Sequence, residues 1–174
     1  MKRILIFALV SALIITPLDF LQVLCGVRTW GTDPWLTPLK FALVGAVLGT
    51  LSYLLDPKPH PAKPWAVATH GLFFASGYLA TCLFPNQFYI LGALTVLLWI
   101  QDLVSRYHYK VSNVETFPFA LVLITMGPLV ELIDVKMGGF TYIAFPGTVP
   151  YWLPFLWVSG AFLTRALTGE EAND

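Results

Sequence analysis

Apolar residues fill six stretches of the chain, and polar or proline- and glycine-rich segments separate them. The stretches run roughly over residues 4–25, 35–55, 65–84, 88–104, 117–135 and 150–167. An α-helix needs about 20 apolar residues to cross the hydrocarbon core of a bilayer, so each stretch predicts a membrane-spanning helix. The fourth and sixth stretches are short, and we expect these helices to stand nearly upright or to reach the interface through flanking residues.

The segments between the stretches support this division. "DPKPHPAKP" carries four prolines and cannot continue a helix. "FPNQ" predicts a tight turn, so the third and fourth helices form a hairpin, and "GGFTYIAFPGTVP" is typical of a loop at the membrane interface. The first stretch resembles a secretory signal, but Leu24 is too large for the residue before a processed Cys25, and we expect a retained span.

Composition makes the membrane assignment firm. Of the 174 residues, 57% are hydrophobic and 11% are charged, and the mean hydropathy is +0.72, whereas a soluble domain carries about 25% charged residues. The formal net charge is zero, so nothing indicates nucleic-acid binding. The sequence therefore predicts an all-α fold: a six-helix bundle that forms one integral membrane domain over residues 1–174.

The distribution of basic residues predicts the orientation of the bundle. Six spans place both termini on one side of the membrane. Basic residues on that side are Lys2, Arg3, Lys58, Lys63, Arg106, Lys110 and Arg165; those on the opposite side are Arg28, Lys40 and Lys136. Because Lys and Arg concentrate in cytoplasmic segments, we expect both termini to be cytoplasmic.

Carboxylates near the outer helix ends are candidate functional groups. In "MGPLVELIDVKMGGFTY", Glu131 and Asp134 are three residues apart at the outer end of the fifth span. Either the helix ends at the interface with both carboxylates in water, or Glu131 faces the bundle interior and binds a polar group of a ligand. Asp19 and Gln22 share a face near the outer end of the first span, at the interface or at the mouth of a cavity.

Small residues along the spans allow the helices to approach closely, and a slot between them could hold a lipid. Gly45 and Gly49 form a small-xxx-small pair, and "ASGYLAT" is a second such stretch. Aromatic and leucine side chains of spans one to five would line the slot. The residues predicted to bind the ligand are Gln22, His70, Ser76, Gly77, Tyr78 and Glu131. Gly77 is the small residue among them, and the others would make polar contacts. The alternative for His70 is a hydrogen bond to a neighbouring helix.

Motifs of known chemistry are absent from the sequence. The histidines show no metal-ligand spacing, no serine lies in GxSxG, and no glycine-rich phosphate loop occurs. We therefore predict no catalytic residue, no metal site and no cofactor. Cys25 and Cys82 both fall near outer helix ends, where a disulfide is conceivable, although two buried apolar thiols are favoured.

Several of these segments, taken in order, resemble the Insig family. "LDFLQVL" is similar to the end of the family's first span, and "DPWLTPLKFALVGAVLGTLSYLLD" to its second. "KPWAVATHGLFFASGYLAT" resembles the third span, "LTVLLWIQD" the fourth, and "YWLPFLWVSGA" the sixth. The resemblance covers most of the chain from Leu18 to Ala161.

This resemblance implies a non-enzymatic role. Eukaryotic Insigs bind oxysterols and hold the sterol sensor Scap or direct HMG-CoA reductase to degradation, and bacterial relatives are thought to hold a lipid such as diacylglycerol. Asp102 matches the family aspartate needed for partner binding, so a membrane-protein partner is implied. The chain ends in "FLTRALTGEEAND" instead of the family's Gly-Asn-Ile-Gly-Arg, has a longer loop after Asp102 and lacks the N-terminal extension of animal members. With the small length, these departures suggest a prokaryotic member, which we expect in the inner membrane.

Three functional hypotheses follow. The first is a non-catalytic, sensor-like protein that binds diacylglycerol or a sterol-like lipid inside the bundle. The second is a small membrane enzyme acting on a lipid or isoprenoid, with Asp19, Glu131 and Asp134 supplying acid–base chemistry. The third, a transporter or channel, is disfavoured by the small size of the chain and by the lack of a charged pathway.

Overall fold

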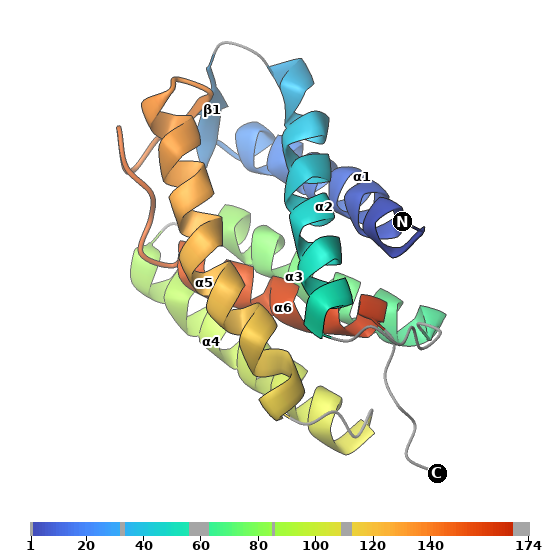
Figure 1. Ribbon diagram of the computed structural model, residues 1–174. Coiled ribbons are helices and arrows are strands. Elements are labelled where there is room, and N and C mark those ends of the chain that lie inside the picture. Colours follow the sequence, from blue (N-terminus) through green and yellow to red (C-terminus); the bar gives the residue numbers. More distant parts are fainter. Residues whose placement is uncertain (1, 32–33, 56–62, 85, 109–112, 169–174) are drawn as a thin grey trace.

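The computed structural model describes residues 2–31, 34–55, 63–84, 86–108 and 113–168, and α-helices dominate this part of the chain (Figure 1). The helices are α1 (Lys2–Leu24), α2 (Thr37–Leu55), α3 (Pro64–Leu83), α4 (Gln87–Leu103), α5 (Asn113–Lys136) and α6 (Leu153–Thr168). Shorter elements are β1 (Arg28–Trp30), the 3-10 turn η1 (Pro34–Leu36), the π-helical turn η2 (Val104–His108) and β2 (Phe140–Tyr142). The six predicted helices are confirmed, close to their predicted bounds.

Helix length and apolarity make this an integral, multi-pass membrane protein. Within the described residues, five helices are long and apolar enough to cross a bilayer, and a shorter apolar helix covers Leu153–Leu167. The fourth span is not short: the π turn η2 prolongs α4, and the apolar helical segment Gln87–Tyr107 has 21 residues. The prediction of a short sixth helix is confirmed.

The helices alternate in direction, so both ends of the chain lie at one end of the bundle. Arg3 at the start of α1 donates a hydrogen bond to the carbonyl of Ser52 near the end of α2, with a distance of 3.1 Å. Ala66 at the start of α3 packs near Ala166 at the end of α6. The cytoplasmic location of this end remains a prediction, and two residues that support it, at positions 58 and 110, lie outside the described ranges.

The short helix α6 is the centre of the bundle. It packs against α3, α4 and α5, and residues along nearly all of its length are buried. The chain that enters it is irregular but protected, since Pro150 and Trp152 are fully buried. Backbone outside a helix is tolerated at membrane depth where protein covers it, so α6 does not need 20 apolar residues to complete its crossing.

Helix α1 ends in a glycine cap that turns the chain into β1. Gly26 has φ +72°, its N–H donates to Val23 O at 3.0 Å, and the N–H of Val27 donates to Gln22 O at 2.9 Å. This pair of bonds is a Schellman motif, which favours glycine because other residues rarely adopt positive φ. Arg28 begins β1 two residues after the glycine.

Helix α5 ends in the same motif. Gly138 has φ +78°, its N–H donates to Val135 O at 3.1 Å, and the N–H of Gly139 donates to Asp134 O at 2.9 Å. Phe140 then begins β2. The two glycines after Lys136 thus redirect the chain across the end of the bundle.

Strands β1 and β2 pair as an antiparallel ribbon, which the all-α prediction did not contain. Arg28 lies opposite Tyr142, and Trp30 lies opposite Phe140. The segment expected to be an interfacial loop therefore contributes a strand. Each strand has only three residues, too few for the alternating pattern that reveals strands in a sequence.

The small-residue contact between α1 and α2 gives a test of the packing. A Cβ added to Gly45 would meet the carbonyl oxygen of Phe7 and, at 2.6 Å, Ser11 Oγ, whereas one added to Gly92 on α4 meets nothing within 4 Å. We expect Gly45→Ala to destabilise the protein by about 1–3 kcal/mol through overpacking. Gly92→Ala should stabilise it by about 0.5–1 kcal/mol through helix propensity. Thermal unfolding in detergent measures both, and equal shifts would contradict the α1–α2 contact.

Candidate functional site

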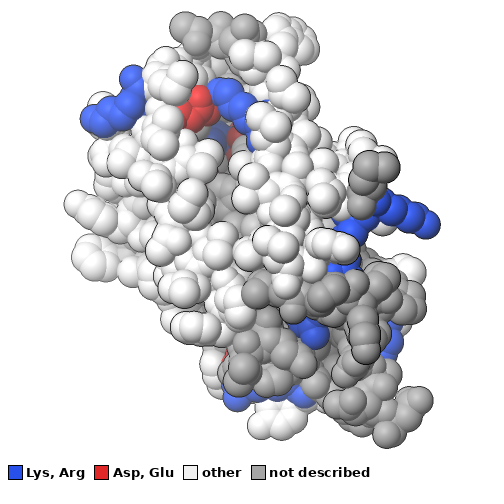
Figure 2. All heavy atoms as spheres, in the orientation of Figure 1, with Lys and Arg blue, Asp and Glu red and all other residues white. Residues whose placement is uncertain are grey.

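A pocket of about 240 Å³ lies at the end of the bundle opposite the chain termini. Residues of α1, β1, α2, α5, β2 and α6 line it: Asp19, Arg28, Trp30, Thr37, Lys40, Phe41, Val44, Val130, Glu131, Ile133, Asp134, Met137, Phe140 and Trp157. Figure 2 shows a hollow in this face between α2 and α5, with acidic and basic atoms at its upper end and uncharged residues around the rest. The pocket is thus polar at one end and mostly apolar elsewhere.

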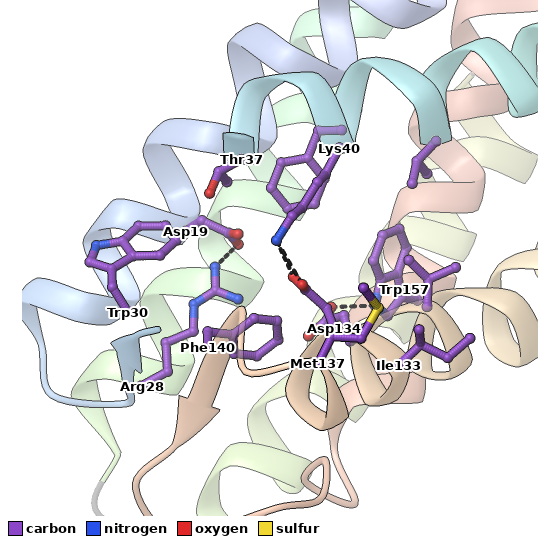
Figure 3. Close-up of a pocket in the computed structure, with 14 residues that line it drawn as sticks. Asp19, Arg28, Trp30, Thr37, Lys40, Ile133, Asp134, Met137, Phe140 and Trp157 are labelled. Carbon is purple, nitrogen blue, oxygen red and sulfur yellow. Dashed lines mark hydrogen bonds and ion pairs between the residues drawn. The ribbon is translucent and has the colours of Figure 1, made fainter. Parts of the chain in front are cut away.

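A buried ion pair forms the first part of the polar end. Arg28 Nη2 on β1 pairs with Asp19 Oδ1 on α1, and the two side chains are 2% and 5% exposed (Figure 3). The guanidinium carbon of Arg28 lies 4.8 Å from the ring centroid of Phe140 and 5.8 Å from that of Trp30. Aromatic faces attract cations, so the rings on β1 and β2 stabilise the positive charge of Arg28, which Asp19 also neutralises.

A second ion pair bridges the two helices that flank the hollow. Lys40 Nζ on α2 donates to Asp134 on α5, at 2.6 Å from Oδ1 and 2.9 Å from Oδ2. Their side chains are 38% and 22% exposed, so this pair lies nearer the surface than the first. Figure 3 shows it between α2 and α5, beside the pair of Asp19 and Arg28.

Glu131 is held by two donors from other elements. Trp157 Nε1 on α6 donates to Oε1 at 2.8 Å, and the hydroxyl of Tyr142 on β2 donates to Oε2. Burial, together with the nearby Glu131 carboxylate, raises the pKa of Tyr142 well above its usual value, so this hydroxyl stays protonated at neutral pH. Glu131 itself is 7% exposed, and the interpretation in which its carboxylate reaches water is wrong.

The charges of the pocket are therefore satisfied from within. Asp19 and Asp134 each have a cation, and Glu131 has two neutral donors. One donor is left over: Arg28 Nε is buried and has no hydrogen-bond acceptor among the residues that the structure describes. The three carboxylates that the sequence singled out do converge on one pocket, but none of them is unengaged.

The other predicted ligand contacts lie elsewhere, beginning with the small and aromatic residues of α3. Gly77 is buried against α6 and α4, since an added Cβ would lie 2.8 Å from Leu156 Cδ1. Tyr78 packs edge-on against Phe74 at 5.2 Å between ring centroids. Ser76 is exposed and lines an outward-facing apolar groove between α3 and α4. None of these residues lines the pocket at Asp19.

Of three further predicted residues, Gln22 and His70 form polar links between helices, and Asp102 pairs within its own helical segment. Gln22 Nε2 on α1 donates to Thr81 Oγ1 on α3 at 2.9 Å. His70 Nδ1 lies 3.3 Å from Gln101 Nε2 on α4, which agrees with the alternative of a hydrogen bond to a neighbouring helix. Asp102 pairs with Arg106 near the terminal end of the bundle, and its role in binding a partner remains a prediction.

The residues that the sequence did not identify are the partners of the carboxylates. Arg28 and Lys40 entered the sequence argument only as basic residues on the side where few are expected. Their position could have indicated a role in the site. Basic residues are few on this side of a membrane protein, and those that occur there usually have a partner or a function. Trp157 and Phe140 gave no signal, since aromatic residues are common at both interfaces.

Fold and pocket together define a class: a small, polytopic helical membrane protein whose polar-ended pocket lies between α2 and α5. Neither a family model nor a curated protein matches the sequence. Among solved structures, the chain matches the crystal structure of a mycobacterial Insig homolog, MvINS from Mycobacterium vanbaalenii, with a TM-score of 0.71. The match covers 97% of this chain and 93% of that chain at 19% sequence identity.

A second structure, a cross-linked trimer of an MvINS variant, matches with the same TM-score of 0.71 and the same 19% identity. The protein therefore has an Insig-like fold, as the order of its segments indicates.

The two ion pairs predict different effects on stability. Asp19→Asn leaves the buried Arg28 cation without a counter-charge, which should cost about 3–5 kcal/mol. Lys40→Gln removes a partly exposed pair and should cost less than about 1 kcal/mol. Thermal unfolding in one detergent compares the variants, and Asp19→Asn combined with Arg28→Gln should recover part of the loss. A harmless Asp19→Asn variant would contradict the buried pair.

Proposed function

We propose that this Insig-like protein binds an uncharged lipid in the pocket between α2 and α5 and acts as a non-catalytic sensor. The observation that carries the proposal is the combination of a polar end whose carboxylates are all bonded within the protein with an apolar, outward-facing rim. The rim consists of Val130 and Ile133 on α5 and of Met137 directly after it, which are 39%, 50% and 77% exposed. A lipid whose polar group enters the pocket can leave its hydrocarbon chains along this rim.

The charges of the site favour a neutral polar group. An anionic headgroup would have to displace Asp19 or Asp134 from its cation, and it would still face Glu131. A cationic headgroup would meet Arg28 and Lys40. A hydroxyl or ester oxygen needs no counter-charge and can accept a hydrogen bond from the unpaired Arg28 Nε. Diacylglycerol and sterol-like lipids, which the family resemblance implies, both carry such groups.

The size of the pocket fits a headgroup better than a whole lipid. A volume of about 240 Å³ is somewhat below the range of about 300–1,000 Å³ typical of ligand pockets. Lipid chains would therefore extend out of the hollow seen in Figure 2, along α2 and α5. We place the protein in the inner membrane of a prokaryote, where diacylglycerol and other neutral lipids can reach the opening laterally.

Convergence of Asp19, Glu131 and Asp134 on one pocket favours a second candidate, an enzyme acting on a lipid or isoprenoid. General acid–base catalysis needs a carboxyl group within reach of the substrate and able to exchange its proton. Here two carboxylates are ion-paired and the third accepts two hydrogen bonds. Binding is therefore the better-supported function, and a catalytic role would require a substrate that replaces one of these partners.

Retention of lipid tests the proposal. Val44 on α2 lines the pocket, and Val47, one turn on, is 64% exposed. We expect Val44→Trp to fill the pocket and to lower lipid retention at least about tenfold, which corresponds to about 1.4 kcal/mol. Val47→Trp, the matched control, should retain lipid as the unaltered protein does. Native mass spectrometry after delipidating washes measures the bound fraction and identifies the lipid.

The identity of the retained lipid separates the two candidates. One dominant neutral lipid, recovered chemically unchanged, supports binding without catalysis. A retained anionic phospholipid, or a mixture with the composition of the bulk membrane, contradicts the proposal. Conversion of an added neutral lipid that is lost in Glu131→Gln, with folding preserved, would establish the enzyme.

A further inference from the structure

We propose that Cys25 and Cys82 form an intramolecular disulfide that joins α1 to α3 at the end of the bundle opposite the termini. Cys25 directly follows α1, and Cys82 lies in the last turn of α3. Both are free thiols in this structure; Cys25 is exposed and Cys82 is half-buried. The expectation of two buried thiols is thus wrong for Cys25, which is open to reaction.

The two residues meet at one backbone oxygen. The N–H of Cys25 donates to Leu21 O at 2.9 Å, and the thiol of Cys82 donates to the same oxygen at 3.8 Å. A disulfide needs Cβ atoms about 3.5–4.5 Å apart, and the shared acceptor places both cysteines at the same point between α1 and α3.

A neighbouring hydrogen bond holds the helices in the required register. Gln22 is one turn before Cys25 on α1, and Thr81 directly precedes Cys82 on α3. Gln22 Nε2 donates to Thr81 Oγ1 at 2.9 Å, and both residues are buried. A buried contact therefore joins α1 and α3 next to both cysteines, which raises the effective concentration of one thiol for the other.

A small polar pocket gives an oxidant access to the pair. Both cysteines line a pocket of about 200 Å³, distinct from the one at Asp19, together with Gln87 and Trp152. Gln87 Oε1 and Trp152 Nε1 are buried there without a hydrogen-bond partner among the described residues, as expected where water enters. If the termini are cytoplasmic, this end faces the oxidising side of the membrane, where disulfides persist.

The reaction is thiol–disulfide exchange with a disulfide-bearing oxidant of that compartment. The exposed Cys25 loses its proton, and its thiolate attacks one oxidant sulfur and displaces the other as a thiolate. Cys82 then loses its proton and attacks the Cys25 sulfur of this mixed disulfide, releasing the second oxidant sulfur. Two electrons and two protons pass from the protein to the oxidant, which becomes a dithiol.

Trapping the thiols in intact cells tests the proposal. Cells producing the full chain are quenched with acid and alkylated, and the purified protein is digested and analysed by mass spectrometry with and without reductant. We expect a peptide linking Cys25 to Cys82, with neither thiol alkylated until reductant is added. Alkylation of both thiols without reductant, or a disulfide between two copies of the chain, would overturn the proposal.

Cys82→Ser is the matched control. In this variant Cys25 should be alkylated without reductant, because its partner is gone. Reductant should lower the unfolding temperature of the unaltered protein by about 5–10 °C and leave that of Cys82→Ser unchanged. An equal effect of reductant on both proteins would count against an intramolecular bond. The outcome does not depend on whether the other pocket holds a lipid.

Discussion

Burial of the Arg28 guanidinium is the constraint on which this end of the molecule depends. A cation removed from water costs several kcal/mol unless its surroundings replace the lost hydration. Asp19 supplies the opposite charge, and the rings of Phe140 and Trp30 supply their faces. These groups come from α1 and from both strands, so the glycine caps after α1 and α5 and the register of the ribbon are all needed to assemble them.

The pocket follows from the same arrangement. Because α1, α5 and the ribbon meet around Arg28, carboxylates from two helices lie at one end of a cavity whose other walls are apolar. Two of the carboxylates are paired with cations and the third accepts two hydrogen bonds, so the polar end can lie next to apolar walls without a bound ion. A site of this kind selects ligands by shape and by neutral hydrogen bonds, which is what a lipid with a hydroxyl or ester group offers.

The sequence predicted the helices well because each depends on local signals. Apolar runs of sufficient length and strong breakers such as "DPKPHPAKP" fix where a membrane helix begins and ends. Site residues depend on pairing across the chain: Lys40 and Asp134 are 94 residues apart, and no local pattern connects them. The stretch around Gly77 shows a local signal that is ambiguous. Small residues predict that something packs closely against the helix, but they do not distinguish a side chain such as Leu156 from a ligand.

The packing also indicates which wall of the pocket can respond to a ligand. In the described part of the chain, α2 packs chiefly on α1, whereas α5 packs on the central helix α6. Across the hollow, Lys40 and Asp134 provide a partly exposed link between α2 and α5, and such a pair is weak enough to break at little cost. A ligand that favours a different α2–α5 spacing therefore meets only this weak contact across the hollow, while α2 keeps its packing on α1 and α5 keeps its packing on α6. The proposed sensor role would use this difference between a firmly packed centre and a weakly linked rim, which arises from how the helices are paired.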